Sequence, residues 1–439
     1  MTKKILVLGA GLVSRPLVHY LTGREGLEVT VATRTVAKAE ALVAGRGRGK
    51  ALSLDVNDMA ALERQVAAHD ISVSLLPATE HVRVARLCLA HDRHMATTSY
   101  ISPEMRALDG EAKARGLSFV NECGVDPGID HMSAMRVING AKAKGGKVVA
   151  FRSYCGGLPA PEANTNPIGY KFSWAPRGVL VAAMNPARYL KDGELVEIPG
   201  SELFAAPEMV EVKGAGRFEG YPNRDSLGYI DMYGLKGVRT MFRGTLRNLG
   251  HCETWYRWVK LGLFAREPRT DLKGLTRAGF MRTFADGKKG DLKQAIAARM
   301  GVAADAPAVA KLAWLGMFDE TPLPSPDGGN VDVMAAAMLE KCAFAPGERD
   351  MLVMQHEFAI EYAGGRSEKV FSSLVDYGIP NGDSSMARTV SLPVAIATRM
   401  ILGGEIRERG VIAPVMPAVY EPILKELETM GITFEERTA

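Results

Sequence analysis

Short runs of apolar residues alternate with stretches of helical periodicity through the first third of the chain. The runs are typical of buried β-strands, and the stretches between them are typical of amphipathic helices. Such an alternation predicts a doubly wound α/β domain, a parallel sheet with helices on both faces that binds ligands at the carboxyl ends of its strands. The expected strands cover residues 4–8, 29–33, 50–54, 71–75, 94–97 and 118–121.

The alternation weakens after about residue 130, where a different organisation begins. Residues 255–339 are mainly helical in pattern and rich in Met and Ala, with a Pro/Gly/Ser/Asp loop at 321–329. A long helix is expected at 384–402, with a kink at Pro393. Strands are expected at 148–154, 210–212, 240–246, 351–361 and 369–377, and a turn-rich stretch at 155–162. A chain of 439 residues has room for two or three domains.

The beginning of the chain predicts a dinucleotide-binding turn. An apolar strand runs into Gly9 and Gly11, and a helical pattern follows. Gly9 allows the tight turn, and Gly11 lets the backbone approach a pyrophosphate. The helix N-terminus offers free N–H groups to the phosphates, so Leu12 and Val13 are expected beside the cofactor. Ser14 replaces the third glycine of the motif, and a strand–turn–helix without a ligand is the alternative.

The end of the second expected strand distinguishes between the two nicotinamide cofactors. NAD-binding units carry Asp or Glu there, and the carboxylate binds the ribose 2′-hydroxyl. This chain has Thr33, Arg34 and Thr35 instead, and arginine with threonine hydroxyls suits a 2′-phosphate. We therefore expect NADP(H) rather than NAD(H), with Arg34 and Thr35 as contacts. A solvated surface arginine is the alternative.

Later strand ends supply further candidate contacts. Asp55 and Val56 follow the third strand and are expected near the adenine, and the backbone at Leu76 is expected to line the cofactor path. After the sixth strand, residues 121–131 hold acids, a cysteine and a histidine beside turn-forming Gly and Pro. Loops with so many ionisable groups over a scaffold often carry function.

Composition and charge exclude several classes of protein. The formal net charge of +4 is small for this length and does not argue for nucleic-acid binding. Five scattered cysteines without a CxxC pair exclude a disulfide framework and a structural zinc site, and they fit the cytoplasm. No apolar stretch is long enough to span a membrane. No metal is expected, because the eight histidines show no metal-binding spacing, and no GxSxG motif points to a hydrolase.

Several unusual strings resemble the saccharopine reductase family, the glutamate-forming saccharopine dehydrogenases. The resemblance runs from residue 2 to about residue 430, and the end of strand two is similar to the fungal, NADPH-using members. Animal members tend to have an acidic residue there. The strings are Ser99-Tyr100-Ile101-Ser102-Pro103, Val125-Asp126-Pro127-Gly128-Ile129-Asp130-His131, Ser153-Tyr154-Cys155-Gly156-Gly157-Leu158-Pro159-Ala160-Pro161, Tyr170-Lys171-Phe172-Ser173-Trp174, Gly220-Tyr221-Pro222-Asn223-Arg224-Asp225-Ser226 and Arg243-Gly244-Thr245-Leu246-Arg247.

The resemblance implies a domain organisation and a reaction. It implies a variant Rossmann NADP-binding domain at 1–130 plus 385–439, a mixed α/β substrate and dimerisation domain at 131–254 plus 345–384, and a helical insertion at 255–344. It implies an oxidoreductase of lysine metabolism that reduces the imine of L-glutamate and L-2-aminoadipate 6-semialdehyde to L-saccharopine with NADPH. These small molecules would be its partners, together with a second copy of the chain in a homodimer.

The resemblance also assigns residues to the substrate, which carries three carboxylates. Each carboxylate loses water on entering a site and needs a matching donor, for which arginine is well suited. Arg243 is either a further contact or part of a surface ion pair, and the ion pair is the alternative for the other arginines too. The implied substrate contacts are Arg224, Thr245, Leu246 and Arg247.

Forming and reducing an imine requires proton transfer, and three residues are candidates for it. Asp126 is the first candidate for proton transfer, because it stands at a strand end where cofactor and substrate should meet. The alternative interpretation is an aspartate that only caps a turn. Tyr100 would donate to the carbinolamine oxygen or bind a carboxylate, unless it only packs. Cys155 is expected to follow a strand and precedes two glycines that permit close approach of a ligand; its alternative is a small buried hydrophobe.

The nicotinamide end of the cofactor has its own expected contacts. Ser99, Val125 and Pro127 are expected to line the nicotinamide together with Asp126, and Ser99 is also expected to touch the substrate. Trp174 lies in a string that the family uses near the nicotinamide, so the resemblance implies that it covers the ring; a core tryptophan is the alternative.

Asp130 and His131 are interpreted as structural. Asp130 is expected to cap a helix that starts near His131, because it comes directly after a Pro-Gly turn.

Two other functions remain as alternatives. A related NADPH-dependent imine reductase of polyamine metabolism, of the carboxyspermidine type, would need acidic residues where this chain has arginines. A non-catalytic NADP-binding sensor would have no need of Tyr100, Asp126 and the arginines, all of which are present.

Overall fold

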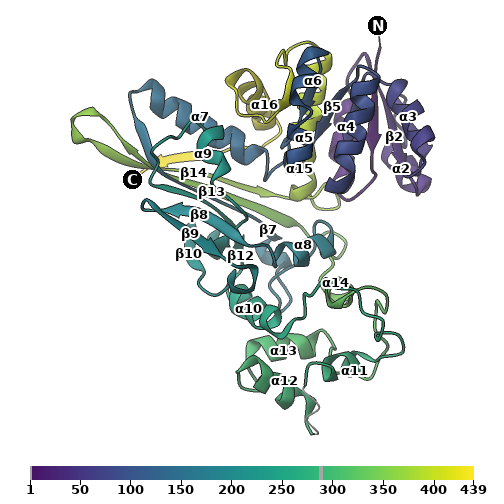
Figure 1. Cartoon of the computed structure of the whole chain (residues 1–439), viewed down its shortest axis with the longest axis vertical. Helices are drawn as coiled ribbons and strands as arrows, with labels where there is room; N and C mark the ends of the chain where they lie inside the picture. The colour runs from purple at the N-terminus through teal and green to yellow at the C-terminus, as the bar shows by residue number, and fades with distance from the viewer. Residues whose placement is uncertain (1, 286–289) are drawn as a thin grey trace. The chain divides into compact units, whose positions relative to one another are not determined.

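The computed structural model describes residues 2–285 and 290–439, which form two compact units (Figure 1). The first unit runs to Gly146 and resumes at Gly382–Glu435, and the second comprises Lys147–Asn381 and Glu436–Ala439. The expected boundary at residue 130 lies inside helix α7 (Ile129–Ala143), which belongs to the first unit. The expected helical insertion is part of the second unit, so the division into three regions stays a prediction.

The first unit is built on a seven-stranded sheet in which every recorded strand pair is parallel. The six strands expected from the sequence are confirmed, and a seventh from the C-terminal segment completes the sheet, as the resemblance implied. The strands, in spatial order, are β15 (Gly410–Ile412), β6 (Ser118–Val120), β5 (His94–Thr97), β4 (Ile71–Ser74), β1 (Lys3–Leu8), β2 (Leu27–Thr33) and β3 (Gly49–Ser53).

Helices cover both faces of this sheet, which explains the unbroken apolar run of β1. Leu6 and Leu8 pack with Leu62 and Val84 on one face, and all four residues from Ile5 to Leu8 are 0% exposed. The helices of the first unit are α1 (Ser14–Thr22), α2 (Val36–Val43), α3 (Met59–Ala67), α4 (His81–Ala90), α5 (Pro103–Arg106), α6 (Asp109–Ala114), α7, α15 (Ser385–Leu402) and α16 (Pro417–Thr429). Pro393 lies inside α15, as expected.

The order of the strands in this sheet reverses at β1. The chain proceeds from β1 outward to β2 and β3, then crosses back to β4 on the other side of β1. Ligands of doubly wound sheets bind where the strand order reverses in this way. The glycine turn that follows β1 lies at this reversal.

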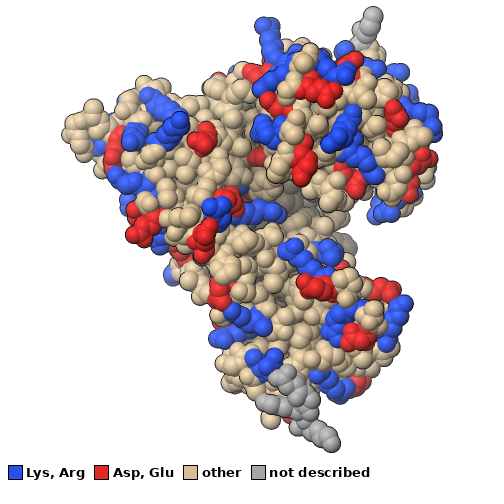
Figure 2. Space-filling model, in the orientation of Figure 1, with Lys and Arg blue, Asp and Glu red and all other residues tan. Residues whose placement is uncertain are grey.

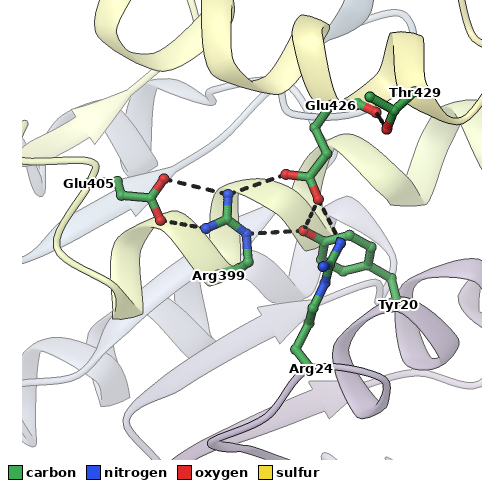
Figure 3. Close-up of polar contacts among 6 residues, drawn as sticks. All are labelled: Tyr20, Arg24, Arg399, Glu405, Glu426 and Thr429. Carbon is green, nitrogen blue, oxygen red and sulfur yellow. Dashed lines mark hydrogen bonds and ion pairs between the residues drawn. The ribbon is translucent and has the colours of Figure 1, made fainter.

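A polar cluster connects the C-terminal helices to α1 (Figure 3). Arg399 of α15 donates from Nε to the Tyr20 hydroxyl at 3.0 Å and pairs with Glu405 and with Glu426 of α16. Tyr20 donates to Glu426 at 2.6 Å, and Arg24 donates to the same oxygen at 2.7 Å. Burial and the bond to Glu426 raise the pKa of Tyr20 to about 12. The cluster therefore joins residues that are 379 and 406 positions apart in sequence.

The second unit is built on a nine-stranded mixed sheet. The pairing of β12 with β7 is parallel, and the recorded pairings of β7 with β13 and β13 with β14 are antiparallel. All five expected strands occur, and β8, β9, β11 and β16 were not expected. The strands are β7 (Lys147–Pro159), β8 (Ala187–Lys191), β9 (Glu194–Ile198), β10 (Glu208–Val212), β11 (Gly216–Pro222), β12 (Thr240–Arg247), β13 (Asp350–Glu361), β14 (Ser367–Tyr377) and β16 (Glu435–Thr438).

The expectation for residues 155–162 was wrong in part, because β7 continues to Pro159 instead of ending near residue 154. Its whole length pairs with β13. The glycines that suggested a turn serve the sheet: a Cβ on Gly156 would lie 2.6 Å from the Leu246 carbonyl oxygen of β12. Glycine at this position permits the close approach of a neighbouring strand.

The expected helical region is confirmed, and its core is aromatic. Trp255, Trp258, Phe264 and Phe280 are buried in one apolar cluster. In the part of the chain that the structure describes, no helix is both long and apolar enough to cross a membrane. Basic and acidic side chains are interspersed over the face shown in Figure 2. The helices of this unit are α8 (Pro176–Ala182), α9 (Gly228–Met232), α10 (His251–Leu261), α11 (Arg277–Arg282), α12 (Leu292–Met300), α13 (Pro307–Trp314) and α14 (Asn330–Lys341).

Candidate active site

The turn after β1 is tight and held by neighbouring strands. Gly9 has φ +113°, a conformation that other residues rarely adopt, and its N–H donates to Ala32 O at 2.9 Å. Leu75, directly after β4, donates to Leu8 O at 2.9 Å. A Cβ on Gly9 would lie 3.1 Å from Leu75 O. A side chain at Gly9 would therefore be both conformationally strained and crowded against Leu75.

Ser14 takes the place of the third glycine and closes the turn. Its hydroxyl accepts from the Gly11 N–H at 3.0 Å and donates to the Gly9 carbonyl at 3.3 Å. Helix α1 begins at Ser14 after Val13, and among the described residues no side chain caps this N-terminus. Leu12 is 68% exposed. Uncapped N–H groups beside an exposed apolar side chain fit the pyrophosphate and ribose of a dinucleotide.

The end of β2 carries the residues expected to select the cofactor. Arg34 and Thr35 are exposed. Thr35 occupies the N-cap of α2, but its hydroxyl does not cap the helix. Within residues 2–285 and 290–439, the structure shows no ion pair for Arg34. Neighbouring Asp55 accepts from the Asn57 N–H at 3.0 Å, so its carboxylate shapes the turn after β3. A guanidinium and a hydroxyl here fit a 2′-phosphate.

A buried histidine connects the ends of β4 and β5. His81 Nδ1 lies 2.9 Å from Ser74 Oγ, and His81 Nε2 lies 2.7 Å from Ser99 Oγ. Nε2 also lies 3.3 Å from Thr97 Oγ1. Burial lowers the pKa of His81 to about 4, so the imidazole is neutral at physiological pH. Sequence reasoning missed His81, although its place at the start of α4, just past a strand end, was a usable signal.

The loops after β5 and β6 bring Tyr100 to Asp126. The Tyr100 hydroxyl donates to Asp126 Oδ1 at 3.0 Å. The loop that carries Asp126 is tightly folded, because Gly124 N–H donates to Pro127 O at 2.9 Å and a Cβ on Gly128 would lie 2.1 Å from Gly124 O. Two of the three acid–base candidates therefore lie in contact.

Glu122 holds the Tyr100 loop from two directions. Its N–H donates to Ser99 O at 3.0 Å, and its Oε1 accepts from the Ile101 N–H at 2.9 Å. Its Oε2 lies 2.8 Å from His131 Nε2, and both side chains are buried. Glu122 has φ +53°, an uncommon conformation for a residue with a side chain. In the sequence this acid is only one of several ionisable residues in the loop at 121–131.

Asp130 does not cap the helix in the expected way. Helix α7 begins at Ile129, with Gly128 at the N-cap position, so Asp130 lies in the first turn. Its carboxylate instead accepts from the Gly128 N–H and steadies the loop in front of the helix. A carboxylate in the first turn is also favoured by the helix dipole.

The second unit carries four other predicted residues on two adjacent strands. Cys155 of β7 is in register with Thr245 of β12, and Leu246 and Arg247 follow on the same strand. Cys155 therefore lies within a strand rather than after one, and the glycine beyond it accommodates Leu246 rather than a ligand.

Arg247 is 7% exposed, and its guanidinium lies 5.1 Å from the centre of the Tyr170 ring. Its Nη1 donates to Leu246 O at 2.8 Å, and its Nε has no partner. Among the described residues no carboxylate pairs with it. A buried guanidinium without an anion is costly, and an anionic ligand would relieve that cost.

The other two arginines differ from Arg247. Arg224 is exposed and has φ +57°, and its carbonyl accepts from the Arg188 N–H at 3.0 Å. Such strain in a residue with a side chain is often found at functional positions. Arg243 is buried with its guanidinium 4.4 Å from the centre of the Tyr229 ring. Arg243 is therefore not a surface arginine, and its role stays a prediction.

Trp174 and Lys171 also belong to the second unit. Trp174 is partly exposed and packs against the large apolar cluster, and a Cβ on Gly178 would lie 2.8 Å from its ring. Lys171 is buried and pairs with Glu348 at 2.6 Å. The expected contact of Trp174 with the nicotinamide stays a prediction.

Comparisons with known proteins agree along the whole chain. The models of the saccharopine dehydrogenase NADP binding domain and C-terminal domain match residues 5–120 and 124–432. The chain is 40% identical to the NADP(+), L-glutamate-forming saccharopine dehydrogenase of Schizosaccharomyces pombe, over 98% of each protein. It is 38% identical to the mitochondrial alpha-aminoadipic semialdehyde synthase of Bos taurus, over 98% of this chain and 47% of that protein. A solved structure of the apo, L-Glu-forming saccharopine dehydrogenase of Saccharomyces cerevisiae aligns with a TM-score of 0.90 at 39% identity, over 100% of each chain.

Proposed function

The chain belongs to the saccharopine dehydrogenase family, and we propose that it is the NADP-dependent, L-glutamate-forming enzyme. It reduces the imine of L-glutamate and L-2-aminoadipate 6-semialdehyde to L-saccharopine, and the reaction is reversible. The observation that carries this assignment is the match to glutamate-forming enzymes over the whole length of both chains at 40% identity. The NADP-binding domain of the family covers the glycine turn and the strand end that carries Arg34.

The reaction has two chemical steps. The amine of glutamate adds to the aldehyde, and the resulting carbinolamine loses water to give a C=N bond. A hydride then adds to the imine carbon and a proton to the nitrogen, which leaves the secondary amine of saccharopine. NADPH supplies the hydride when bound, and the protein supplies binding, orientation and proton transfer.

Residues of the first unit are proposed to bind the cofactor and move protons. Gly9, Gly11 and the N-terminus of α1 would hold the pyrophosphate, and Arg34 with Thr35 would hold the 2′-phosphate. Asp126 would exchange a proton with the reacting nitrogen or with water, and Tyr100, bonded to it at 3.0 Å, would orient the carboxylate and share that proton.

Residues of the second unit are proposed to bind substrate carboxylates. Arg247 is the strongest of them, because it is buried and no carboxylate of the described chain neutralises it. Arg224 is exposed and conformationally strained, which fits a residue held ready for a ligand. Thr245 and Leu246 stand beside Arg247 on β12 and would add backbone and hydroxyl contacts.

A competition among amine substrates tests the function. Purified protein with NADPH and aminoadipate semialdehyde is given glutamate, a diamine or no amine, and loss of reduced cofactor is followed. The assignment predicts turnover with glutamate. Turnover only with the diamine would favour the polyamine-type reductase, and NADPH binding without turnover would favour a sensor.

We further propose that the chain forms a homodimer and works in the cytoplasm. The five cysteines are free and buried, which fits a reducing compartment. Sedimentation velocity would test the dimer, and fractionation of the source cells would test the compartment.

A further inference from the structure

We propose that His81 and Glu122 are positioning residues with separate tasks, His81 for the Ser99 hydroxyl at the cofactor and Glu122 for Tyr100 at Asp126. The proposal rests on the proposed function. Neither residue was among the candidates that the sequence suggested. Both are buried, and both contact the same segment, Thr97–Ile101, from different elements.

We assign the hydrogen of the neutral His81 ring to Nε2. Two oxygens, Ser99 Oγ at 2.7 Å and Thr97 Oγ1 at 3.3 Å, surround Nε2, and Thr97 Oγ1 already accepts from the Ser99 N–H. This arrangement suits a nitrogen that carries the hydrogen and donates it, while Ser74 donates to Nδ1 at 2.9 Å. The Ser99 oxygen then accepts from His81, and its own O–H is left to donate to a ligand.

Ser99 is half-buried, whereas His81, Ser74 and Thr97 are buried. The chain of hydrogen bonds thus ends on the Ser99 hydroxyl, which solvent or a ligand can reach. An acceptor on the nicotinamide end of a dinucleotide, such as its carboxamide oxygen, matches a hydroxyl donor at this strand end. His81 would act on the cofactor only through Ser99.

Glu122 acts on the other side of the same segment. It bonds to the residues before and after Tyr100, at Ser99 O and Ile101 N–H, so the Tyr100 backbone is fixed on both flanks. The second carboxylate oxygen is engaged by His131 of α7, so the clamp cannot rotate freely. Loss of the clamp would let Tyr100 move from Asp126, and small misplacements of reacting groups lower rates strongly.

The test uses substitutions that remove the contacts of one of the two residues at a time. His81→Asn places an amide near Nδ1 but does not reach Ser99, and His81→Gln reaches the position of Nε2. Glu122→Ala removes the carboxylate bonds to Ile101 and His131 but keeps the backbone bond to Ser99 O, and Glu122→Gln keeps an acceptor for Ile101. Two controls are matched in chemistry: His69→Asn changes another buried histidine bonded to a hydroxyl, that of Thr30, and Asp109→Ala changes another carboxylate that accepts from a backbone N–H, that of Val411.

The readouts are the Kd of NADPH by fluorescence titration, the steady-state kcat and its pH profile, and the melting temperature without cofactor. We expect His81→Asn to raise the NADPH Kd by about 5- to 10-fold, which His81→Gln largely restores. We expect Glu122→Ala to lower kcat by about 10- to 100-fold and to shift the pH profile, with little change in the NADPH Kd. Glu122→Gln should recover most of kcat.

Three results would overturn the proposal. His81→Asn could raise the Kd no more than His69→Asn does, or Glu122→Ala could lower kcat no more than Asp109→Ala does. Alternatively, Kd and kcat could change together in both variants. A parent protein that binds NADPH but is inactive with glutamate and the semialdehyde would instead refute the proposed function, while the Kd measurements on His81 would still stand.

Discussion

The hydroxyl of Tyr100 donates to Oδ1 of Asp126 over 3.0 Å, although the two residues lie 26 positions apart in sequence. Their loops follow β5 and β6, which pair in parallel, so the carboxyl ends of these strands bring the two side chains together. A phenol and a carboxylate that share a hydrogen are suited to proton transfer.

Substituting Asp126 should impair the chemical step rather than cofactor binding. Asp126→Asn is expected to lower kcat by about 100-fold or more, because an amide cannot take up the proton. The NADPH Kd should stay within about 2-fold of the parent, since removal of one proton-transfer group costs the cofactor little. The measurement is kcat across the pH range, together with a binding titration.

Asp58→Asn is a matched control for this prediction. Asp58 is a capping aspartate whose carboxylate accepts from the Ala61 N–H at 3.0 Å at the start of α3. If Asp126→Asn behaved like Asp58→Asn, with kcat and pH profile close to the parent, Asp126 would be only a turn residue.

Removing Arg34 should relax the preference for NADPH. Arg34→Ala is expected to lower kcat/KM for NADPH by about 10- to 100-fold, since a charge-assisted bond to phosphate is lost. NADH kinetics should change little. Arg48→Ala is the control, because Arg48 is also exposed but lies before β3, at the opposite end of the strands. Equal losses with both cofactors would contradict a 2′-phosphate contact.

Shortening Arg247 should weaken substrate binding. Arg247→Lys is expected to raise KM for saccharopine by about 10-fold or more, since the planar, bidentate donor is lost. Arg152→Lys is a suitable comparison, because Arg152 already pairs with Glu208 at 2.6 Å on the neighbouring strand β7. An unchanged KM in Arg247→Lys, with normal NADPH binding, would show that Arg247 holds no carboxylate.

Arg399→Ala should destabilise the first unit through the cluster in Figure 3. It removes the contacts to Tyr20, Glu405 and Glu426 at once, and we expect a loss of about 1–2 kcal/mol after allowance for solvent screening. Arg24→Ala, which loses the bond to Glu426 and the contact with the Tyr20 ring, should cost less. The melting temperatures of both variants are compared with that of the parent. An Arg399→Ala variant that melts at the same temperature as Arg24→Ala would mean that the cluster does not stabilise the packing of the C-terminal helices.

His81 should make the folded protein less stable in acid. Unfolded His81 takes up a proton near pH 6.5, but the folded protein resists it until about pH 4 because the imidazole is buried. Its contribution to stability is therefore complete above pH 6.5 and is lost as pH falls toward 4, by roughly 2 kcal/mol at about pH 5. His81→Gln should flatten the fall of melting temperature between pH 7 and 5. A fall as steep as that of the parent would contradict the buried, neutral state.

The sequence predicted the first unit well because local and tertiary signals agree there. The apolar run Ile5–Leu8 is buried on both faces of a parallel sheet, and the glycine turn follows directly. The second unit was harder to predict. The continuation of β7 past Cys155 depends on pairing with β13, about 200 residues later, and Gly156 looks like a turn residue until Leu246 of β12 is placed against it.

The residues of the candidate site also divide into those that the sequence indicates and those that depend on tertiary contacts. Arg34 and Asp126 stand at strand ends, where the position alone indicates function. His81 and Glu122 act through other residues, and their contacts with Ser99 and Ile101 exist only once β4, β5 and β6 are side by side. Periodicity and motif spacing carry no information about such contacts.

The most direct test of the central claim is the mass of the product formed with deuterated cofactor. The protein is incubated with glutamate, aminoadipate semialdehyde and NADPH that carries deuterium at the transferable position. We expect saccharopine that contains one deuterium, at the carbon that was the aldehyde. Consumption of the cofactor without this product, or no consumption by protein that binds NADPH, would contradict it.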